Sequence, residues 1–373
     1  MTNASNKTTD NPLVDYSYNR FRQEQYSVGY EFSQQLSEGI KFRQNLRYGQ
    51  TDTILNNLLP GDPDFTTNTV SRNAIRFDEH MKAFNIDNQL QMDFNTASVA
   101  HTLLAGVDYS WLDANARRFS AVAPSLSITN PVYGLDIADP TNAVNNNDQT
   151  TAQLGVYMQD QIHLTDQWLV TLGGRHDDIS MRTQNNLSGS SSWVDKDAWT
   201  GRAGLTYLAG NGLAPYISYA ESFVPNSGTD SQNRTFDPSK AHQYEIGVKY
   251  QPDSNLLMTL AAFDITKSNV LTNEIVDGLA TGYQVASGEV RSRGIEWQTQ
   301  AQLNANLDVL ASYPYTAAAI SKSNNGDQGK QQANVPKNMA SAWQHHGFHH
   351  GIFDRLLLST GLRYIARMYG DTA

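Results

Sequence analysis

The stretch HQYEIGVKYQPDSNLLMTLAAFDITKSNV, residues 242–270, decides the fold because it contains two alternating runs around a turn. In the first run Tyr244, Ile246, Val248 and Tyr250 alternate with Gln, Glu, Gly and Lys. Such alternation is typical of a β-strand with one apolar and one polar face. The apolar face looks inward in a soluble sheet, but in a transmembrane barrel it meets lipid and the polar face lines a wet lumen. The rest of the chain must decide between the two.

The alternation extends along the chain, and we predict fourteen strands that pair into hairpins. Short turns are expected at residues 37–39, 95–97, 164–166, 210–212, 252–254 and 304–306 and near Gly351. Longer polar connections lie between the hairpins, at 53–70, 119–150, 183–197, 226–239, 271–282 and 320–336. A strict alternation of short and long connections is unusual in a β-sandwich and typical of a transmembrane barrel. The segments also reach the roughly 9–11 residues that a tilted spanning strand needs.

Aromatic residues near the ends of the apolar faces also favour the transmembrane barrel. In HTLLAGVDYSW (101–111), one face carries Leu103, Ala105 and Val107 and ends in Tyr109 and Trp111. Tyr and Trp prefer the interface between a membrane and water. The pattern therefore favours lipid outside and water inside, and a soluble all-β binding or adhesin module is the alternative at this point.

Composition excludes several classes of function. No run of 18 apolar residues exists, so helical membrane spans are not expected, and the mean hydropathy is −0.51. The net charge of −10 without a basic cluster makes nucleic-acid binding an unfavoured function. The absence of cysteine excludes disulfides, thiol catalysis and cysteine-containing metal sites. Without a nucleophile elbow, a Gly-rich phosphate loop or an HExxH run, we predict that the protein is not an enzyme.

The first residues, MTNASNKTTDNPLVDYSYNRF, lack the basic region and apolar stretch of a signal peptide. Either the protein is cytosolic or the chain is incomplete. We expect residues 1–20 to be a loop or disordered start, and 21–373 to form the barrel domain.

Several ordered motifs resemble one protein family. They include PYISYAESFVPNSG (215–228), FDPSKAHQYEIGVKYQP (236–252), GEVRSRGIEWQTQAQL (288–303), VPKNMASAW (335–343) and GLRYIARMYGD (361–371). Upstream, GVYMQDQIHLTDQWLVTLGGRHD (155–177) and NPVYG (130–134) fit the same series. Together they resemble the TonB-dependent siderophore receptors of Gram-negative outer membranes, and most closely the ferrichrome and ferrioxamine type of hydroxamate receptor.

The resemblance implies an antiparallel transmembrane barrel in the outer membrane, with about 14 strands of a 22-stranded family barrel. It implies uptake of a ferric siderophore, energised by the TonB–ExbB–ExbD system acting on a plug domain. The siderophore binds the iron, so no protein-bound cofactor or metal is expected. No plug-like sequence or TonB box precedes the first strand, and about four strands are expected to be missing at each end. By itself this fragment is not expected to transport. A passive porin-like barrel is an alternative.

Two local departures from the family pattern stand out. Pro314 takes a position where the family usually has Thr or another strand former, although proline cannot donate to a sheet. Four histidines, His345, His346, His349 and His350, would share a face only on a helix, and a zinc site there is the less favoured interpretation.

Candidate ligand contacts come from aromatic residues at or near the long connections, because aromatic rings suit a bulky, weakly charged ferric hydroxamate. The candidates are Trp111, Phe119, Tyr133, Trp193, Phe223, Phe236 and Tyr283. For each, packing within its own loop or in the interface girdle is the alternative. Glu245 and Glu296 are expected to face the lumen, paired with Lys249, Arg291 or Arg293, on the wall that meets the plug in the family.

Overall fold

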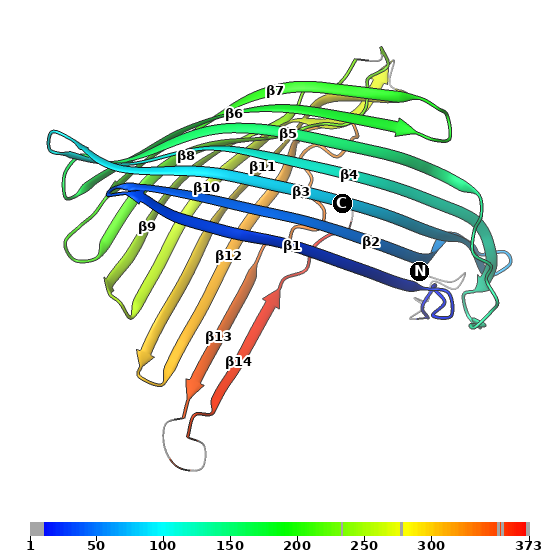
Figure 1. Ribbon diagram of the computed structural model, residues 1–373. Helices are drawn as coiled ribbons and strands as arrows, with labels where there is room; N and C mark the ends of the chain where they lie inside the picture. The colour runs from blue at the N-terminus through cyan, green and yellow to red at the C-terminus, as the bar shows by residue number, and fades with distance from the viewer. Residues whose placement is uncertain (1–10, 233, 277–278, 349–350, 352–353, 371–373) are drawn as a thin grey trace.

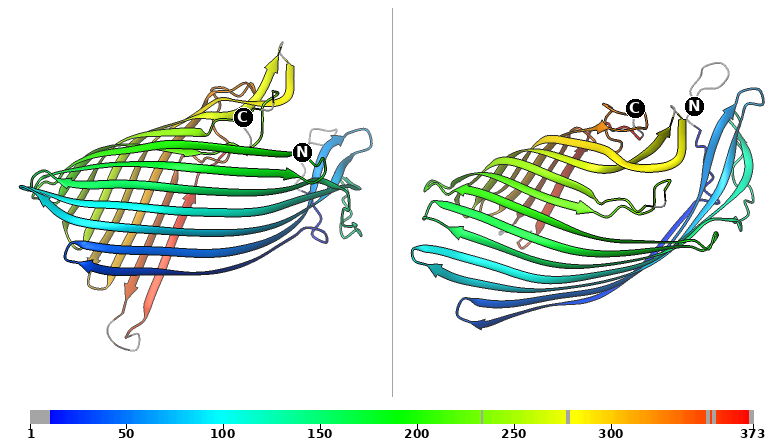
Figure 2. Two further views of the ribbon diagram at one scale, coloured as in Figure 1. Left: turned by 45° about the horizontal axis from the view of Figure 1, so that its top comes forward. Right: turned by 90° about the horizontal axis from the view of Figure 1, so that it is seen from above.

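Fourteen strands form one sheet in the computed structural model, which describes residues 11–232, 234–276, 279–348, 351 and 354–370 (Figure 1). The sheet order follows the chain, and neighbouring strands are antiparallel. The strands are β1 (Arg20–Ser37), β2 (Ile40–Asp64), β3 (Thr69–Thr96), β4 (Val99–Ser127), β5 (Ala143–His163), β6 (Trp168–Asn185), β7 (Ser191–Tyr207), β8 (Leu213–Val224), β9 (Ser239–Asp253), β10 (Leu256–Val276), β11 (Leu279–Asn304), β12 (Leu307–Lys322), β13 (Met339–Gly347) and β14 (Leu357–Ile365). The sheet curves so that β1–β7 and β8–β14 form two facing walls (Figure 2). The predicted all-β class and the fourteen strands are confirmed.

The six short turns lie where the alternation predicts them. The first joins β1 to β2 at residues 38–39, where Gly39 has a φ of 75°. A side chain there would be strained, and its Cβ would lie 2.6 Å from the carbonyl oxygen of Asp93. The connection expected near Gly351 joins β13 to β14, and residues 349–350 and 352–353 within it lie outside the described part of the chain.

Four of the six long connections are shorter than predicted, because the strands continue into them. β2 ends at Asp64 and β3 begins at Thr69, so the predicted 53–70 loop shrinks to 65–68. Likewise β10 extends to Val276 and β11 begins at Leu279, inside the predicted 271–282 loop. Antiparallel strands can pair where both faces are wet, so the loss of apolar alternation does not mark the end of pairing. Of the other four, two shorten to 128–142 and 186–190, and two keep nearly the predicted bounds, at 225–238 and 323–338.

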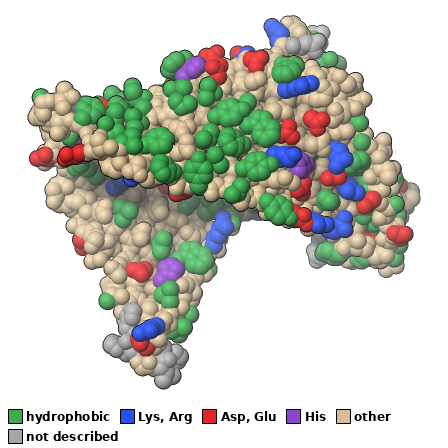
Figure 3. Space-filling model, in the orientation of Figure 1, with side chains coloured by type: hydrophobic (Ala, Val, Ile, Leu, Met, Phe, Trp, Pro, Cys, Tyr) green, Lys and Arg blue, Asp and Glu red, His purple; other side chains and the backbone are tan. Residues whose placement is uncertain are grey.

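Exposure shows which way each face points. In β9, Tyr244 is 58% exposed and Ile246 is 62% exposed, whereas Gln243 and Glu245, which alternate with them, are half-buried. The strand register sets Ile246 beside Ile217 and Ala262, so the apolar face continues across β8, β9 and β10. Hydrophobic side chains also crowd the face of the front strands in Figure 3. We call this apolar side the outer face and the opposite, polar side the lumenal face.

Buried apolar packing gathers at the ends of the strands that carry the long connections. Tyr18, Leu58, Ala74 and Ala123 form a cluster, and Ile137 packs against it. Residues 11–19 and the 128–142 connection together cover the ends of β2–β4, and we call this covering layer the cap. The cap keeps these apolar side chains from water.

A buried carboxylate fastens the cap. Asp15 is 1% exposed and accepts hydrogen bonds from the backbone N–H of Ser17 (3.1 Å), the Ser17 hydroxyl (2.8 Å) and the backbone N–H of Gly134 (3.0 Å). Burial raises the pKa of this carboxyl, but these hydrogen bonds and the charge of Arg72 lower it more. The net result is a pKa below the ordinary value of 3.8.

We expect Asp15→Ala to lower the free energy that docks the cap by about 1–2 kcal/mol, since two backbone donors lose their acceptor. Because the pKa is depressed, the stabilisation is complete above the ordinary pKa of 3.8 and is lost as the pH falls through the lower, folded-state value. Hydrogen exchange of residues 11–19 against pH checks this. In wild type we expect protection that weakens as the pH falls. In the Asp15→Ala variant we expect protection that does not depend on pH in this range. Protection that is unchanged at low pH would contradict it.

Pro314 interrupts one ladder of the sheet and spares the other. Pairing of β11 with β12 runs through Glu296 and Pro314, whereas pairing of β12 with β13 stops at Ser312 and Ser341 and returns only as an isolated bridge from Tyr315 to Asn338. Thr316 donates its N–H to the carbonyl of Lys337 on the β13 side. Donors two residues apart in a strand point to the same neighbour, so the Pro314 nitrogen faces the gap.

Replacing Pro314 by Thr should close this gap, since Thr supplies the missing donor and suits a strand. We expect the free energy of unfolding to rise by about 1 kcal/mol, the typical value of one hydrogen bond. Hydrogen exchange at residues 339–341 measures the result. Equal protection in both proteins would show that the break has another cause.

Candidate functional site: the lumenal wall and the loops above it

An arginine with two carboxylates organises the lumenal face of β4–β6. Arg175 in β6 donates from Nη2 to Asp108 in β4 at 2.9 Å and from Nε to both oxygens of Asp177 at 2.9 and 2.8 Å. The Asp177 side chain is 0% exposed, and its Oδ1 also accepts from Gln153 at 2.8 Å. Such charge-assisted, multidentate bonds fix the planar guanidinium in one position.

Two glycines let these large side chains lie flat on the sheet. A Cβ at Gly155 would lie 2.0 Å from Nη2 of Arg175, and one at Gly106 would lie 2.3 Å from the Tyr157 ring. The Tyr157 hydroxyl donates to Asp87 at 2.7 Å, and the Arg175 guanidinium stands 5.5 Å from the Tyr157 ring centre. The glycines therefore make room for the polar network.

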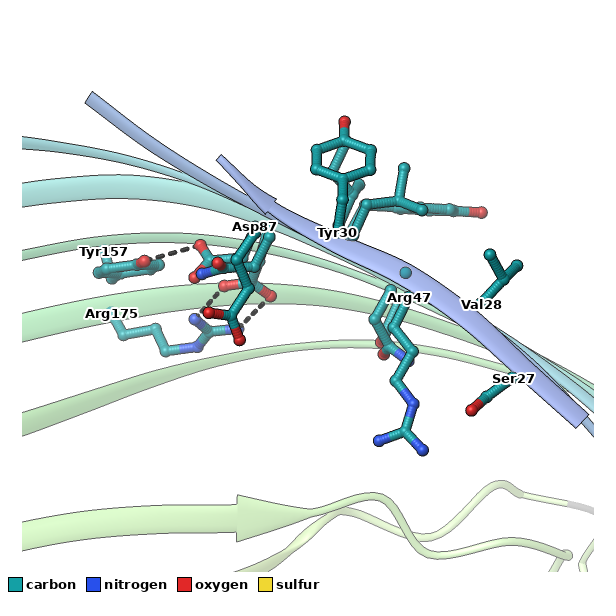
Figure 4. Close-up of a pocket in the computed structure, with 16 residues that line it drawn as sticks. Ser27, Val28, Tyr30, Arg47, Asp87, Tyr157 and Arg175 are labelled. Carbon is teal, nitrogen blue, oxygen red and sulfur yellow. Dashed lines mark hydrogen bonds and ion pairs between the residues drawn. The ribbon is translucent and has the colours of Figure 1, made fainter. Parts of the chain in front are cut away.

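This network lines a hollow of about 810 Å³ (Figure 4). Arg47 and Ser27 reach to one side of the nearby strands, while Val28 and Tyr30 point to the other, as the strand alternation requires. The lumenal wall is polar, charged and open to water. It can hold polar groups of a ligand or of another protein segment.

Glu245 and Glu296 lie on the lumenal face, but their predicted partners do not bind them. Glu245 accepts from the hydroxyl of Tyr216 at 2.6 Å and from the amide of Gln243 at 2.7 Å. Lys249 stands 5.5 Å above the Tyr216 ring. The predicted pairing with cations is thus wrong for the described residues.

Arg291 and Arg293 are on the opposite side of the sheet. Both donate to Asp264, which faces Tyr244 across the β9–β10 ladder and so belongs to the outer face. Strand alternation explains the error. Arg291 and Arg293 lie an even number of residues from Ile295 and so point to the same face as Ile295, whereas Glu296 points to the opposite face.

The seven aromatic candidates do not come together. Trp111 lies on the outer face of β4 opposite Phe84, Trp193 on the outer face of β7 opposite Arg182, and Phe223 on the outer face of β8. Phe119 is half-buried near the end of β4, and Phe236 is 6% exposed inside the 225–238 connection. Tyr133 is 38% exposed in the 128–142 connection, and Tyr283 in β11 is 49% exposed. No contact between the rings of any two of the seven occurs within the described ranges.

The histidine run forms strand at its described positions. His345 and His346 are neighbours in β13, so they point to opposite faces, and the ring of His345 lies 2.8 Å from the Ser359 hydroxyl. His349 and His350 lie outside the described residues. Within the part of the chain that the structure describes, no three histidine or acidic side chains gather as metal ligands.

Sequence reasoning missed the network around Arg175. Its members come from four strands, and only the strand register brings them together. One signal was present, because Gly106 and Gly155 fall on polar faces, where a strand gains nothing from a glycine unless a neighbour covers it.

Comparison with known proteins gives a consistent result. A family model described as "TonB dependent receptor-like, beta-barrel" matches residues 2–373. The chain is 35% identical over 387 residues to the ferrichrome outer membrane transporter/phage receptor of Escherichia coli K12, covering 95% of this chain and 50% of the relative. It is 32% identical to the ferrioxamine B receptor of Salmonella typhimurium, with the same coverage of 95% and 50%. The chain thus spans about half the length of these curated relatives.

Solved structures agree on the fold. The siderophore receptor PiuA from Acinetobacter baumannii superposes with a TM-score of 0.81 at 20% identity, covering 98% of this chain and 57% of that one. The ferric-catecholate import receptor Fiu from E. coli K12 gives a TM-score of 0.79 at 21% identity, covering 96% and 55%.

Proposed function

Because the chain belongs to the TonB-dependent receptor β-barrel family, we propose that it forms part of an outer-membrane receptor for ferric siderophores of the hydroxamate type. The family consists of outer-membrane transporters and not of enzymes. The hydroxamate preference rests on the curated relatives named for ferrichrome and ferrioxamine, at 35% and 32% identity.

One observation carries this proposal: the sheet turns an apolar face outward and a hydrogen-bonded polar face to its lumen. A soluble module would bury the face that carries Tyr244 and Ile246, which are 58% and 62% exposed. Antiparallel strands with an apolar outside and a polar inside suit a barrel that surrounds a water-filled path. Uptake then consists of binding and conformational change without bond-making, and the siderophore carries its own iron.

We place ligand capture at the end of the barrel with the long connections. We assign it to Tyr133, which is 38% exposed in the 128–142 connection, and to Tyr283, which is 49% exposed where β10 and β11 meet at that end of the sheet. Their rings would supply contact area at low entropy cost. Glu245 and Glu296 face the lumen and would meet the plug domain, on which the TonB–ExbB–ExbD system acts in the intact receptor.

Growth tests this proposal. Because the chain by itself is not expected to transport, it is expressed as the barrel segment of a full-length receptor that also carries a plug domain and a TonB box. The host is a Gram-negative strain that lacks its own siderophore receptors, with a single ferric siderophore as the iron source. We expect growth on a ferric hydroxamate. This growth should require TonB and should be weaker in the Tyr133→Ala/Tyr283→Ala variant. Growth on a ferric catecholate alone would overturn the hydroxamate assignment. Growth that persists without TonB would favour the porin-like alternative.

A further inference from the structure

β7 and β8 separate toward the long-connection end of the sheet, at the boundary between the two walls of Figure 2. Their pairing ends at Arg202 and Ala220, although both strands continue beyond these residues. The next N–H along β7, that of Gly201, donates to Oε2 of Glu221 at 2.9 Å and not to a backbone oxygen. A hollow of about 370 Å³ lies beside these two residues. We call residues 193–199 of β7 the open edge.

The direction of the Gly201 donor shows which backbone groups point into the gap. Donors two residues apart in a strand point to the same neighbour, and the register of β6 with β7 has no shift that would change this order. The backbone groups that point away from β6 are therefore those of Trp193, Asp195, Asp197 and Trp199. Among the residues that the structure describes, no backbone group pairs with them. The open edge thus offers hydrogen-bonding groups over six residue steps, or roughly 20 Å.

β12 also lacks a strand neighbour at this end of the sheet, but there a connection takes the place of the strand. The 323–338 connection folds back along β12, and its backbone bonds to Thr316, Ala318 and Ile320 at 2.9, 3.0 and 3.0 Å. The chain itself therefore covers the edge of β12. The 225–238 connection, which follows β8, forms no such backbone bond with the open edge within the described ranges.

The 225–238 connection lies instead on the lumenal side of the open edge. Lys196, which points to the lumen, donates from Nζ to Asp237 at 2.9 Å. Val194 and Ala198 on the same side are 2% and 3% exposed. A ligand therefore reaches the open edge from outside the barrel.

The outward side chains at the open edge are acidic and aromatic. They are exposed and belong to Trp193, Asp195, Asp197 and Trp199, joined by Asp178 of β6, which lies opposite Asp197 in the register. Two basic groups are near them. His176 lies 3.6 Å from Asp197, and the Arg182 guanidinium stands 4.9 Å from the Trp193 ring centre. Three carboxylates against one arginine and one histidine leave the patch negative and suited to a cationic partner.

We propose that the open edge binds an extended, cationic peptide segment of another protein by adding it as a strand beside β7. Backbone hydrogen bonds give such strand addition its affinity, and alternate side chains give it specificity. Residues opposite one another in an antiparallel pair share a face. The segment would therefore place two basic residues, two positions apart, opposite Asp195 and Asp197, with apolar residues opposite Trp193 and Trp199. The proposal concerns the outside of the barrel and is independent of the siderophore.

Peptide binding tests it. The probe is the fluorescently labelled peptide acetyl-VTKTKTV-amide, which carries valine and lysine on one face. It is titrated with the full chain in uncharged detergent micelles, and its fluorescence anisotropy is measured. We expect saturable binding of one peptide per chain. The peptide with glutamate in place of both lysines should not bind, and neither should the peptide N-methylated at both lysines, which lacks donors toward β7. Absence of saturable binding by the first peptide, or equal binding by either control, would overturn the proposal.

Variants of the open edge separate charge from backbone pairing. Asp195→Asn/Asp197→Asn keeps the backbone and should bind the lysine peptide roughly fivefold more weakly, since two exposed ion pairs are lost. Asp195→Asn/Asp197→Pro also removes a donor that points into the gap and spares the β6 ladder, so it should bind a further fivefold more weakly. Asp166→Asn, an exposed acid in the β5–β6 turn, should bind as wild type does.

Binding equal to wild type in the Asp195→Asn/Asp197→Asn variant would overturn the proposal. If circular dichroism shows that the proline variant does not fold, the N-methylated peptide decides the role of the backbone with the wild-type chain.

Discussion

Replacing Arg175 by Ala should lower the free energy of unfolding by about 3 kcal/mol, because it strands a buried carboxylate. Asp177 is 0% exposed and, among the residues that the structure describes, would keep only the Gln153 amide, a neutral donor, as its side-chain partner. Asp108 on the next strand but one loses its bidentate partner too. The Arg175 side chain is 29% exposed, so water recovers part of the loss, and we take the lower end of the range for broken buried pairs.

Denaturant titration in detergent micelles measures this effect. Arg202→Ala is the matched control, since Arg202 is a lumenal arginine on the neighbouring strand β7 without an ion pair among the described residues. We expect it to change the free energy of unfolding by less than about 0.5 kcal/mol. Similar losses in the two variants would show that the Arg175 network does not stabilise the wall.

Placing a charge on the outer face should have a comparable cost. We expect Ile246→Arg to lower the stability of the membrane-inserted protein by roughly 2–4 kcal/mol, the cost of Arg on the lipid side near the bilayer midplane. Ile246 lies in the middle of the apolar run from Tyr244 to Tyr250, so its side chain cannot easily reach the interface.

The control for Ile246→Arg is Gln243→Arg, three residues away in the same strand and on the lumenal face. It should be tolerated within about 0.5 kcal/mol, because the lumenal face is wet. Unfolding in lipid vesicles compares the two variants. If Gln243→Arg were the more harmful substitution, the assignment of faces would be reversed.

Alternation in the sequence was sufficient to predict the strands and the short turns. Apolar side chains such as Tyr244 and Ile246 recur with period two where one face of a strand meets an apolar environment, which is lipid in a transmembrane barrel, so each crossing leaves a readable pattern. Beyond the membrane both faces are wet and the pattern fades. That is why the continuation of β2 to Asp64 could not be predicted, although its residues pair with β3 as far as Asp64, with one register shift between Pro60 and Pro63.

The charge partners depend on register, which the sequence does not state. Strand alternation alone could have shown that Arg291 and Arg293 point to the opposite face from Glu296. Finding Asp264 as their partner required the β10–β11 alignment. The same holds for Arg175, whose partner Asp108 is 67 residues away in the sequence. The ligand aromatics were chosen from loops by residue type, and chemistry alone could not tell Trp111 on the outer face from Tyr133 in a connection.

The most direct test of the central claim is a single-cysteine scan of β9 in the membrane. The chain has no cysteine of its own, so each introduced thiol reports on one position. Cysteines replace Gln243, Glu245 and Lys249 on one face and Tyr244, Ile246 and Val248 on the other, and each protein is treated with a water-soluble thiol reagent. We predict that the first three react and the second three are protected by lipid. Reaction of the second set with protection of the first would contradict the account, because the apolar face would then be the wet one.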